Sequence, residues 1–278
     1  MTASELADSV NAREWYHSIE LAPGIVTPGW FDTRSVAQRV PMPKSLTGKR
    51  CLDVGTFDGF WAFEMERRGA TEVVAVDILD PTKWDWPANS SAATTAAIGA
   101  RKGSGEGFEI AQKALDSAVK RLELSVYDID PTDSGFFEFI FAGSLLLHLR
   151  DPIGALMRLR AVCSGQLLIV DAVNPLLSAL FPRRPVATLD GQGRPWWWRP
   201  NVAGLVRMAE AAGFRSTGKP ITFGMPAGRG QDRPRIQRHM LRHPSSMSVM
   251  LRTRFGDPHA AVLTEAMGDA DADLPHAS

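Results

Sequence analysis

Asp53, Gly55, Gly59 and Asp77 have the residue types and the spacing that suit an adenosine-containing cofactor. The segment Cys51–Gly59 is an apolar run that leads into Asp-x-Gly-x-x-x-Gly. Glycine allows a sharp turn and lets a ligand approach the backbone closely, and a helix beginning beyond it offers unpaired N–H groups to negative charge. Asp77 ends the next apolar run, 22 residues after Gly55, where a carboxylate can accept both ribose hydroxyl protons.

Phe57 separates this segment from a dinucleotide-binding fingerprint. In Gly-x-Gly-x-x-Gly the second glycine lets the backbone approach a pyrophosphate. Phe57 stands at that position here. The sequence therefore disfavours NAD as the cofactor.

These residues resemble motifs I and II of class I S-adenosylmethionine-dependent methyltransferases. The resemblance implies S-adenosylmethionine as cofactor, with Asp53 and the glycine loop on its methionine part and Asp77 on its ribose. Leu124–Asp128 resembles the next motif, whose strand end lies against adenine. The residues assigned to the cofactor are Asp53, Gly55, Thr56, Phe57, Gly59, Asp77, Tyr127, Asp128 and Gly143.

The segment Phe141–Pro152 resembles the fourth-strand motif of a narrower family, which contains the tRNA wobble-uridine carboxymethyltransferase. Trp198–Asn201 also fits that family, and the resemblance extends from about Gly48 to Phe223. That tRNA enzyme has a long N-terminal extension, whereas the core here begins near residue 50. It also has a tyrosine that contacts the extra carboxylate of its modified cofactor, where this chain has Leu147. Because an apolar side chain cannot hydrogen-bond a carboxylate, we expect ordinary S-adenosylmethionine and a different acceptor.

Two histidines are candidate general bases for methyl transfer to a hydroxyl. His148 follows the fourth expected strand, and the carboxyl ends of such strands face the ligand crevice. His17 lies in an N-terminal arm that could fold over the site and exclude water. Either imidazole could accept a proton near neutral pH; alternatively, His148 packs under the cofactor and His17 belongs to an aromatic anchor of the arm.

Substrate contacts are expected from three side chains near the same edge. Tyr16 precedes His17 in the arm, Asp171 ends the fifth expected strand, and Trp196 begins a run of three tryptophans. Tryptophan can stack on a sugar or an aromatic ring, and a carboxylate can orient a hydroxyl. Loop packing of the tryptophans and a solvated Asp171 are the alternatives.

Apolar runs alternating with helical segments predict an α/β fold of the Rossmann-like class I methyltransferase type. Its mostly parallel seven-stranded sheet would have helices on both faces. Expected strands are 50–55, 71–77, 122–127, 137–142 and 166–170, with 214–223 and 235–242 as a closing antiparallel pair. Expected helices are 3–13, 60–68, 108–117, 151–162 and 201–212, and 86–107 is expected to be a mobile loop.

We expect one catalytic domain with additions. Residues 1–48 are predicted to form an N-terminal arm or lid, and 49–245 a methyltransferase domain with a substrate-selecting insert at 174–199. Residues 246–278 are predicted to be a tail whose end, rich in alanine and aspartate, is disordered.

Composition limits the remaining possibilities. The chain has 31 basic and 31 acidic residues, so zero net charge disfavours long-range capture of RNA. Seven arginines between Arg229 and Arg254 could form an RNA face, but a solvated edge is favoured. The two cysteines lack zinc-ligand spacing, so no metal is expected, and no apolar run approaches membrane-spanning length. The expected location is cytoplasmic, and the sequence does not predict an oligomeric state.

Three functions remain open. The favoured one is O-methylation of a hydroxylated small molecule, such as a sugar or an aromatic natural product. The second is modification of the tRNA wobble uridine, and the third is a non-catalytic module that binds the cofactor.

Overall fold

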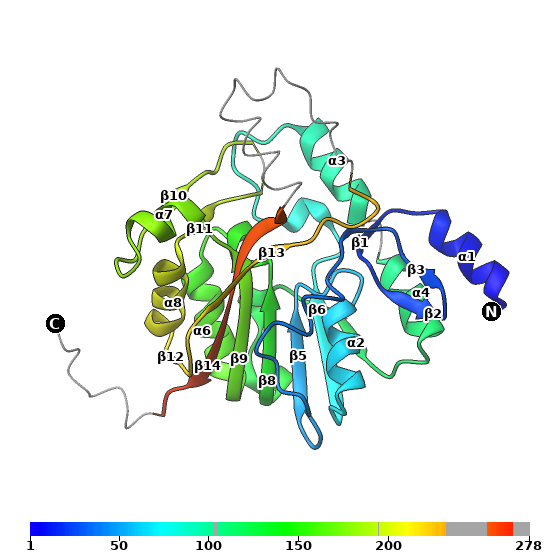
Figure 1. Ribbon diagram of the computed structural model, residues 1–278, viewed down its shortest axis with the longest axis horizontal. Coiled ribbons are helices and arrows are strands. Elements are labelled where there is room, and N and C mark those ends of the chain that lie inside the picture. Colours follow the sequence, from blue (N-terminus) through cyan, green and yellow to red (C-terminus); the bar gives the residue numbers. More distant parts are fainter. Residues whose placement is uncertain (103–104, 194, 232–254, 269–278) are drawn as a thin grey trace.

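The computed structural model describes residues 1–102, 105–193, 195–231 and 255–268, and its centre is an eight-stranded sheet with helices on both faces (Figure 1). The strands follow the order β12-β14-β9-β8-β5-β6-β7, and β13 also pairs with β14. Their bounds are β5 Arg50–Val54, β6 Glu72–Asp77, β7 Lys120–Glu123, β8 Phe137–Gly143, β9 Cys163–Ala172, β12 Phe214–Ser216, β13 Ile221–Met225 and β14 Asp257–Ala266.

Strands β5 to β9 run parallel, which confirms the expected mostly parallel sheet. Their sequences are nearly continuous apolar runs because both faces of the sheet are covered. Alternate residues enter two separate cores: Cys51 and Phe139 face one side, while Leu52 and Ile140 face the other. The carboxyl ends of these strands meet at one edge, where the candidate site residues gather.

Helices cover the sheet from both sides. The helices α2 (Phe60–Arg67) and α4 (Glu106–Ala114) bury residues in the first core, and α6 (Pro152–Val162) and α8 (Val202–Ala211) bury residues in the second. Asp151 accepts a hydrogen bond from the Gly154 N–H at 2.8 Å, so it caps α6 as expected.

The N-terminal arm is an integral part of the first core. It contains α1 (Ala3–Asn11) and two small sheets, and it buries Trp15, Leu21 and Leu46 against α2 and its neighbours. Its strands are β1 Trp15–His17, β2 Glu20–Ala22, β3 Ile25–Val26 and β4 Gly29–Phe31. The segment after β13 holds the arm in place, since Gly228 and Gly230 donate backbone hydrogen bonds to the carbonyls of Trp30 and Gly29.

The predicted C-terminal tail is wrong for residues 257–266. They form β14, which lies between β9 and the strands β12 and β13 and is antiparallel to all three. Ala260, Ala261 and Val262 are almost completely buried, so small apolar side chains here pack between the helical layers. The strand predicted at 235–242 and the chain end after 268 lie outside the described residues.

Two other expectations need correction. The segment 86–107, expected as a loop, contains α3 (Ala92–Lys102), which lies above the strand ends in Figure 1, and the start of α4; η1 (Pro81–Lys83) precedes this segment. The third strand begins and ends earlier than expected, at Lys120–Glu123, and a short turn of helix, η2 (Val126–Asp128), follows it. The remaining elements are α5 Pro131–Ser134, η3 Leu146–His148, α7 Pro175–Leu180, β10 Ala187–Leu189 and β11 Trp198–Pro200.

Candidate active site

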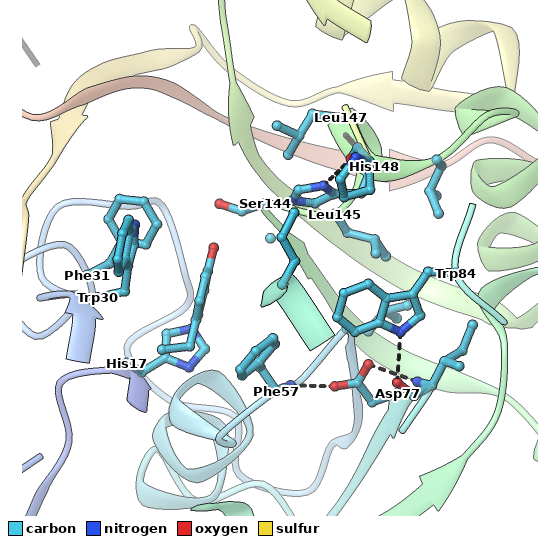
Figure 2. Close-up of a pocket in the computed structure, with 18 of the residues that line it drawn as sticks. His17, Trp30, Phe31, Phe57, Asp77, Trp84, Ser144, Leu145, Leu147 and His148 are labelled. Carbon is cyan, nitrogen blue, oxygen red and sulfur yellow. Dashed lines mark hydrogen bonds between the residues drawn. The ribbon is translucent and has the colours of Figure 1, made fainter. Parts of the chain in front are cut away.

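A cavity of about 830 Å³ opens at the carboxyl ends of β5, β6, β8 and β9. Asp77 and Trp84 lie at one end of it and Trp30 and Phe31 at the other, with Phe57 between them (Figure 2). The walls of the cavity come from the N-terminal arm, the glycine loop after β5 (residues 55–59, called the cofactor loop below), η3 and the 174–199 insert. The cavity thus joins a candidate cofactor crevice, at Asp77, to an aromatic chamber lined by Trp30 and Phe31.

Asp53 places a buried carboxyl group in the wall of this cavity. Its side chain is 1% exposed, and burial raises its pKa to about 7. The nearby Thr56 hydroxyl partly offsets this rise, yet Asp53 Oδ2 and Thr56 Oγ1 have no hydrogen-bond partner of good geometry among the described residues. A buried carboxylate gains stability from a cation, so the ammonium group of a bound methionine moiety fits this position.

Glycines in the loop after β5 and at the end of β8 allow close packing around the cavity. Gly55 has φ +76° and lines the cavity, while Gly59 has φ +90° and lies behind the wall. A Cβ at Gly59 would lie 2.5 Å from the Phe63 ring, and one at Gly143 would lie 2.4 Å from Phe141. Both positions therefore require glycine.

Asp77 lies at the carboxyl end of β6 and lines the cavity. Its Oδ2 accepts the Phe57 N–H and its Oδ1 accepts the Ile78 N–H, each at 2.8 Å (Figure 2). Each carboxylate oxygen can accept further hydrogen bonds, so the same group can hold the two ribose hydroxyls. Trp84 stands beside Asp77 and donates from its indole to the Ile78 carbonyl at 3.1 Å.

Of the other predicted cofactor residues, some reach the cavity and some do not. Tyr127 lines it, but its phenol donates to Asp85 at 2.7 Å and accepts the Asp151 N–H at 3.1 Å. Burial raises the pKa of this phenol. Thr56 and Asp128 are not among the residues that line the cavity, so the structure gives them no direct place at its surface.

Tyr16 and His17 are fixed over the cofactor loop. The Asp58 carboxylate accepts the backbone N–H of Tyr16 at 2.5 Å and of His17 at 2.9 Å. The Tyr16 ring lies 4.7 Å from the Phe57 ring, and both Tyr16 and His17 line the cavity. Burial lowers the pKa of His17 to about 3 and raises that of Tyr16, which makes His17 a weak base at neutral pH.

His148 ends η3 and lines the cavity opposite the cofactor loop. Its Nδ1 donates to the Pro195 carbonyl at 2.5 Å, because a carbonyl can only accept. The Trp197 N–H donates to the Leu147 carbonyl at 2.7 Å. These bonds join η3 to the insert and bring Trp196 into the cavity wall.

Asp171 does not line the cavity, so the predicted substrate contact needs correction. It is 1% exposed beneath the loop after β8, where it accepts the backbone N–H groups of Leu146 and Ala172 at 2.7 Å. Burial raises its pKa to about 7. Asp171 thus positions the loop instead of facing a substrate.

Two side chains that line the cavity and one that supports it were not predicted from the sequence. Ser144 and His259 are 3.1 Å apart in the wall, and Asp58 anchors the arm. Ser144 directly follows the motif glycine, which could have indicated it. His259 comes from β14, which was assigned to a tail. Among the described residues no group of three His, Cys, Asp or Glu side chains is placed to hold a metal ion.

Comparisons with known proteins agree with this geometry. A family model described as a methyltransferase domain matches residues 32–217. The tRNA U34 carboxymethyltransferase of Alcanivorax borkumensis is 28% identical to this chain over 184 residues. The enzyme of the same name from Pseudomonas aeruginosa is 28% identical over 182 residues. Each match covers 64% of this chain, which spans 48% of the length of either relative.

Solved structures share the fold at low identity. The N-terminal domain of EvdMO1, solved with S-adenosylhomocysteine and D-fucose, has a TM-score of 0.55 at 14% identity, covering 96% of this chain and 98% of that one. A methyltransferase from Bacillus halodurans has a TM-score of 0.51 at 14% identity, covering 85% and 99%. No helix within the described ranges combines the length and apolar character needed to cross a membrane.

Proposed function

The chain belongs to the methyltransferase domain family and uses S-adenosylmethionine, and we propose that it methylates a hydroxyl group of a small molecule. The observation that supports this most is the continuity of the cavity. One end has the carboxylates Asp53 and Asp77, and the other has the aromatic walls Trp30, Phe31 and Trp196.

The size and lining of the cavity suit a small acceptor. A volume of about 830 Å³ falls within the ~300–1,000 Å³ usual for small-molecule sites. Aromatic faces can stack on a sugar or a phenolic ring while excluding water. The arm and the insert both contribute to the walls, which favours a compact acceptor over a polymer.

The chemistry required of the protein itself is limited. Bound S-adenosylmethionine supplies a methyl group on a sulfonium leaving group. The side chains must hold the acceptor close, exclude water and accept the hydroxyl proton. The imidazoles of His17, His148 and His259 line the cavity and are candidates to accept that proton.

Leu147 supports ordinary S-adenosylmethionine instead of a carboxylated form. It lines the cavity and is 8% exposed. Its apolar side chain gives a carboxylate no hydrogen bond.

The second candidate function, modification of the tRNA wobble uridine, is favoured by the names of the two bacterial relatives. The arginines from Arg233 to Arg254, which belong to the possible RNA face, lie outside the described residues.

Transfer of a labelled methyl group tests the proposal. The full chain is incubated with S-[methyl-³H]adenosylmethionine and either D-fucose, catechol or bulk tRNA, and each acceptor is then separated and counted. We expect label in the fucose or catechol fraction as an alkali-stable ether. Label in tRNA alone, or tRNA modification only with the carboxylated cofactor, would favour the second function. Asp77→Ala, which should bind the cofactor more weakly, is the low-activity control.

A further inference from the structure

Ser144 and His259 form a pair of polar side chains in the wall of the cavity, which Tyr16 also lines. Ser144 Oγ lies 3.1 Å from His259 Nε2. Tyr16, Ser144 and His259 come from the arm, from the loop after β8 and from β14, so only the folded chain brings them together.

The direction of each hydrogen bond follows from the His259 ring. Its Nδ1 lies 2.8 Å from the Asp257 carbonyl, which can only accept, so Nδ1 carries the proton. His259 Nε2 is then an acceptor in the neutral ring, and the Ser144 hydroxyl donates to it. The Ser144 oxygen is left to accept a hydrogen bond from a hydroxyl bound in the cavity.

We propose that Ser144 and His259 are a proton relay that removes the acceptor's hydroxyl proton during methyl transfer; this inference rests on the proposed O-methylation. The acceptor oxygen forms its bond to the methyl carbon while the carbon–sulfur bond breaks, leaving the electron pair on sulfur. The acceptor proton passes to the Ser144 oxygen, and the Ser144 proton passes to His259 Nε2. The products are a methyl ether, S-adenosylhomocysteine and the His259 imidazolium, which later releases its proton to water.

The fold holds both this pair and the nearby wall of the cavity at Tyr16 in place. The Tyr16 backbone is bound to Asp58, and its ring lies between Phe57 and Phe31, at 4.7 and 5.4 Å. Ser144 has φ +47°, and its N–H donates to the Val170 carbonyl at 2.7 Å. Such rigid placement is what efficient proton transfer requires.

His259 is equally well fixed. It pairs with Ala172 across β14 and β9, and its ring stacks on Phe223 at 6.1 Å. The charged groups that act on it are Asp257, which favours the imidazolium, and Arg199, which opposes it. Asp58, Asp171 and Asp257 all act on Tyr16 and disfavour its anion. Tyr16 therefore stays neutral, and His259 is the final acceptor of the proton.

The variants that test the relay are chosen to retain packing. Ser144→Ala and Ser144→Gly both remove the hydroxyl, and glycine tolerates the positive φ. His259→Gln keeps polarity without titration near neutral pH. Ser164→Ala is the control, because its hydroxyl bonds the Phe137 carbonyl at the far end of β9.

One readout needs no acceptor. In ¹⁵N-histidine spectra of the full chain with S-adenosylhomocysteine, we expect a His259 signal of the Nδ1–H form, identified by its loss in His259→Gln. Its Nε2 resonance should shift in both Ser144 variants and stay unchanged in Ser164→Ala. An Nε2–H form, or a resonance insensitive to Ser144, would overturn the relay.

The second readout is methyl transfer to whichever hydroxylated compound, D-fucose or catechol, accepts label. We expect turnover to fall by about 10²-fold or more in both Ser144 variants and in His259→Gln. Affinity for S-adenosylhomocysteine should change by less than about 3-fold, measured by calorimetry. The acidic limb of the pH profile should disappear in His259→Gln, which a merely structural role would not cause.

The two failures are distinguishable. A wild-type chain that methylates a hydroxyl, with variants that retain turnover, overturns the relay but not the proposed function. A wild-type chain that methylates neither compound but labels tRNA overturns the proposed function and the relay with it.

Discussion

Asp58 binds the backbone of Tyr16 through a 2.5 Å hydrogen bond and so joins the cofactor loop to the N-terminal arm. The same carboxylate accepts the His17 N–H at 2.9 Å and is 5% exposed. This bond couples the glycine loop after β5 to the aromatic end of the cavity, because movement of the loop would displace the Tyr16 ring.

Replacing Asp58 should therefore destabilise the chain. Asp58→Ala leaves two backbone N–H groups without this acceptor, so the free energy of unfolding should fall by about 1–3 kcal/mol. Urea unfolding measures it. Asp133→Ala, at an exposed carboxylate of α5, should change the free energy by less than about 0.5 kcal/mol. An Asp58→Ala protein as stable as wild type would show that the arm is held by its apolar contacts alone.

Cofactor affinity should depend on pH through Asp53. Because burial raises its pKa to about 7, the carboxyl is largely protonated at pH 5.5 and ionised at pH 8. Only the ionised form attracts an ammonium group, so affinity for S-adenosylhomocysteine should rise as the pH increases through about 7. Asp53→Asn should weaken binding and flatten this dependence in calorimetry. A variant that retains the wild-type pH dependence would assign it to another group.

The same shift predicts how unliganded stability changes with pH. A carboxyl group whose pKa is raised on folding takes up protons in the folded state, so stability falls as the pH rises from about 4 toward 7. Asp171 contributes in the same direction. The difference between wild type and Asp53→Asn in urea unfolding at pH 5 and pH 8 isolates the share due to Asp53. Equal pH dependence in both proteins would contradict the raised pKa.

Asp77 should determine affinity for the ribose. Asp77→Ala removes the acceptor of the two hydroxyl protons and the partner of the Phe57 N–H, so affinity for S-adenosylhomocysteine should fall by about 10-fold or more. Calorimetry checks this, with Asp133→Ala as the control for loss of a surface carboxylate. Unchanged affinity in Asp77→Ala would refute the assignment of this residue.

Much of the sheet could be predicted from local sequence. Strands such as Glu72–Asp77 are apolar and β-branched because both faces are buried, and that pattern is visible without a structure. Asp151 and Pro152 likewise identify the start of α6 through capping chemistry, which is local. The positions of the candidate cofactor residues that follow such strands were predictable for the same reason.

The acceptor side was less predictable because long-range contacts determine it. Strand β14 lies between strands that are distant in sequence, and its alanines give little local preference for a strand. Once it was assigned to a tail, His259 was missed. Asp171 ended a strand as expected, but the loop above it folds back and donates to it. Strand-end position alone does not show which side chains face a cavity.

His148 provides the last prediction, because its hydrogen bond favours a positioning role over that of a general base. Its Nδ1 bonds the Pro195 carbonyl and so holds the insert, including Trp196, against the cavity. If the relay ends at His259, His148→Ala should raise the KM for the acceptor and leave the acidic limb of the pH profile in place. That limb should lie below the ordinary histidine pKa of about 6.5, since burial lowers the pKa of His259. Turnover should rise with pH through this limb as the imidazole loses its proton and becomes able to accept another. Steady-state kinetics of His148→Ala and His259→Gln, measured side by side from pH 5 to 9, separate the two roles. A fall of about 10²–10⁴-fold in turnover with loss of the limb in His148→Ala, and not in His259→Gln, would make His148 the base.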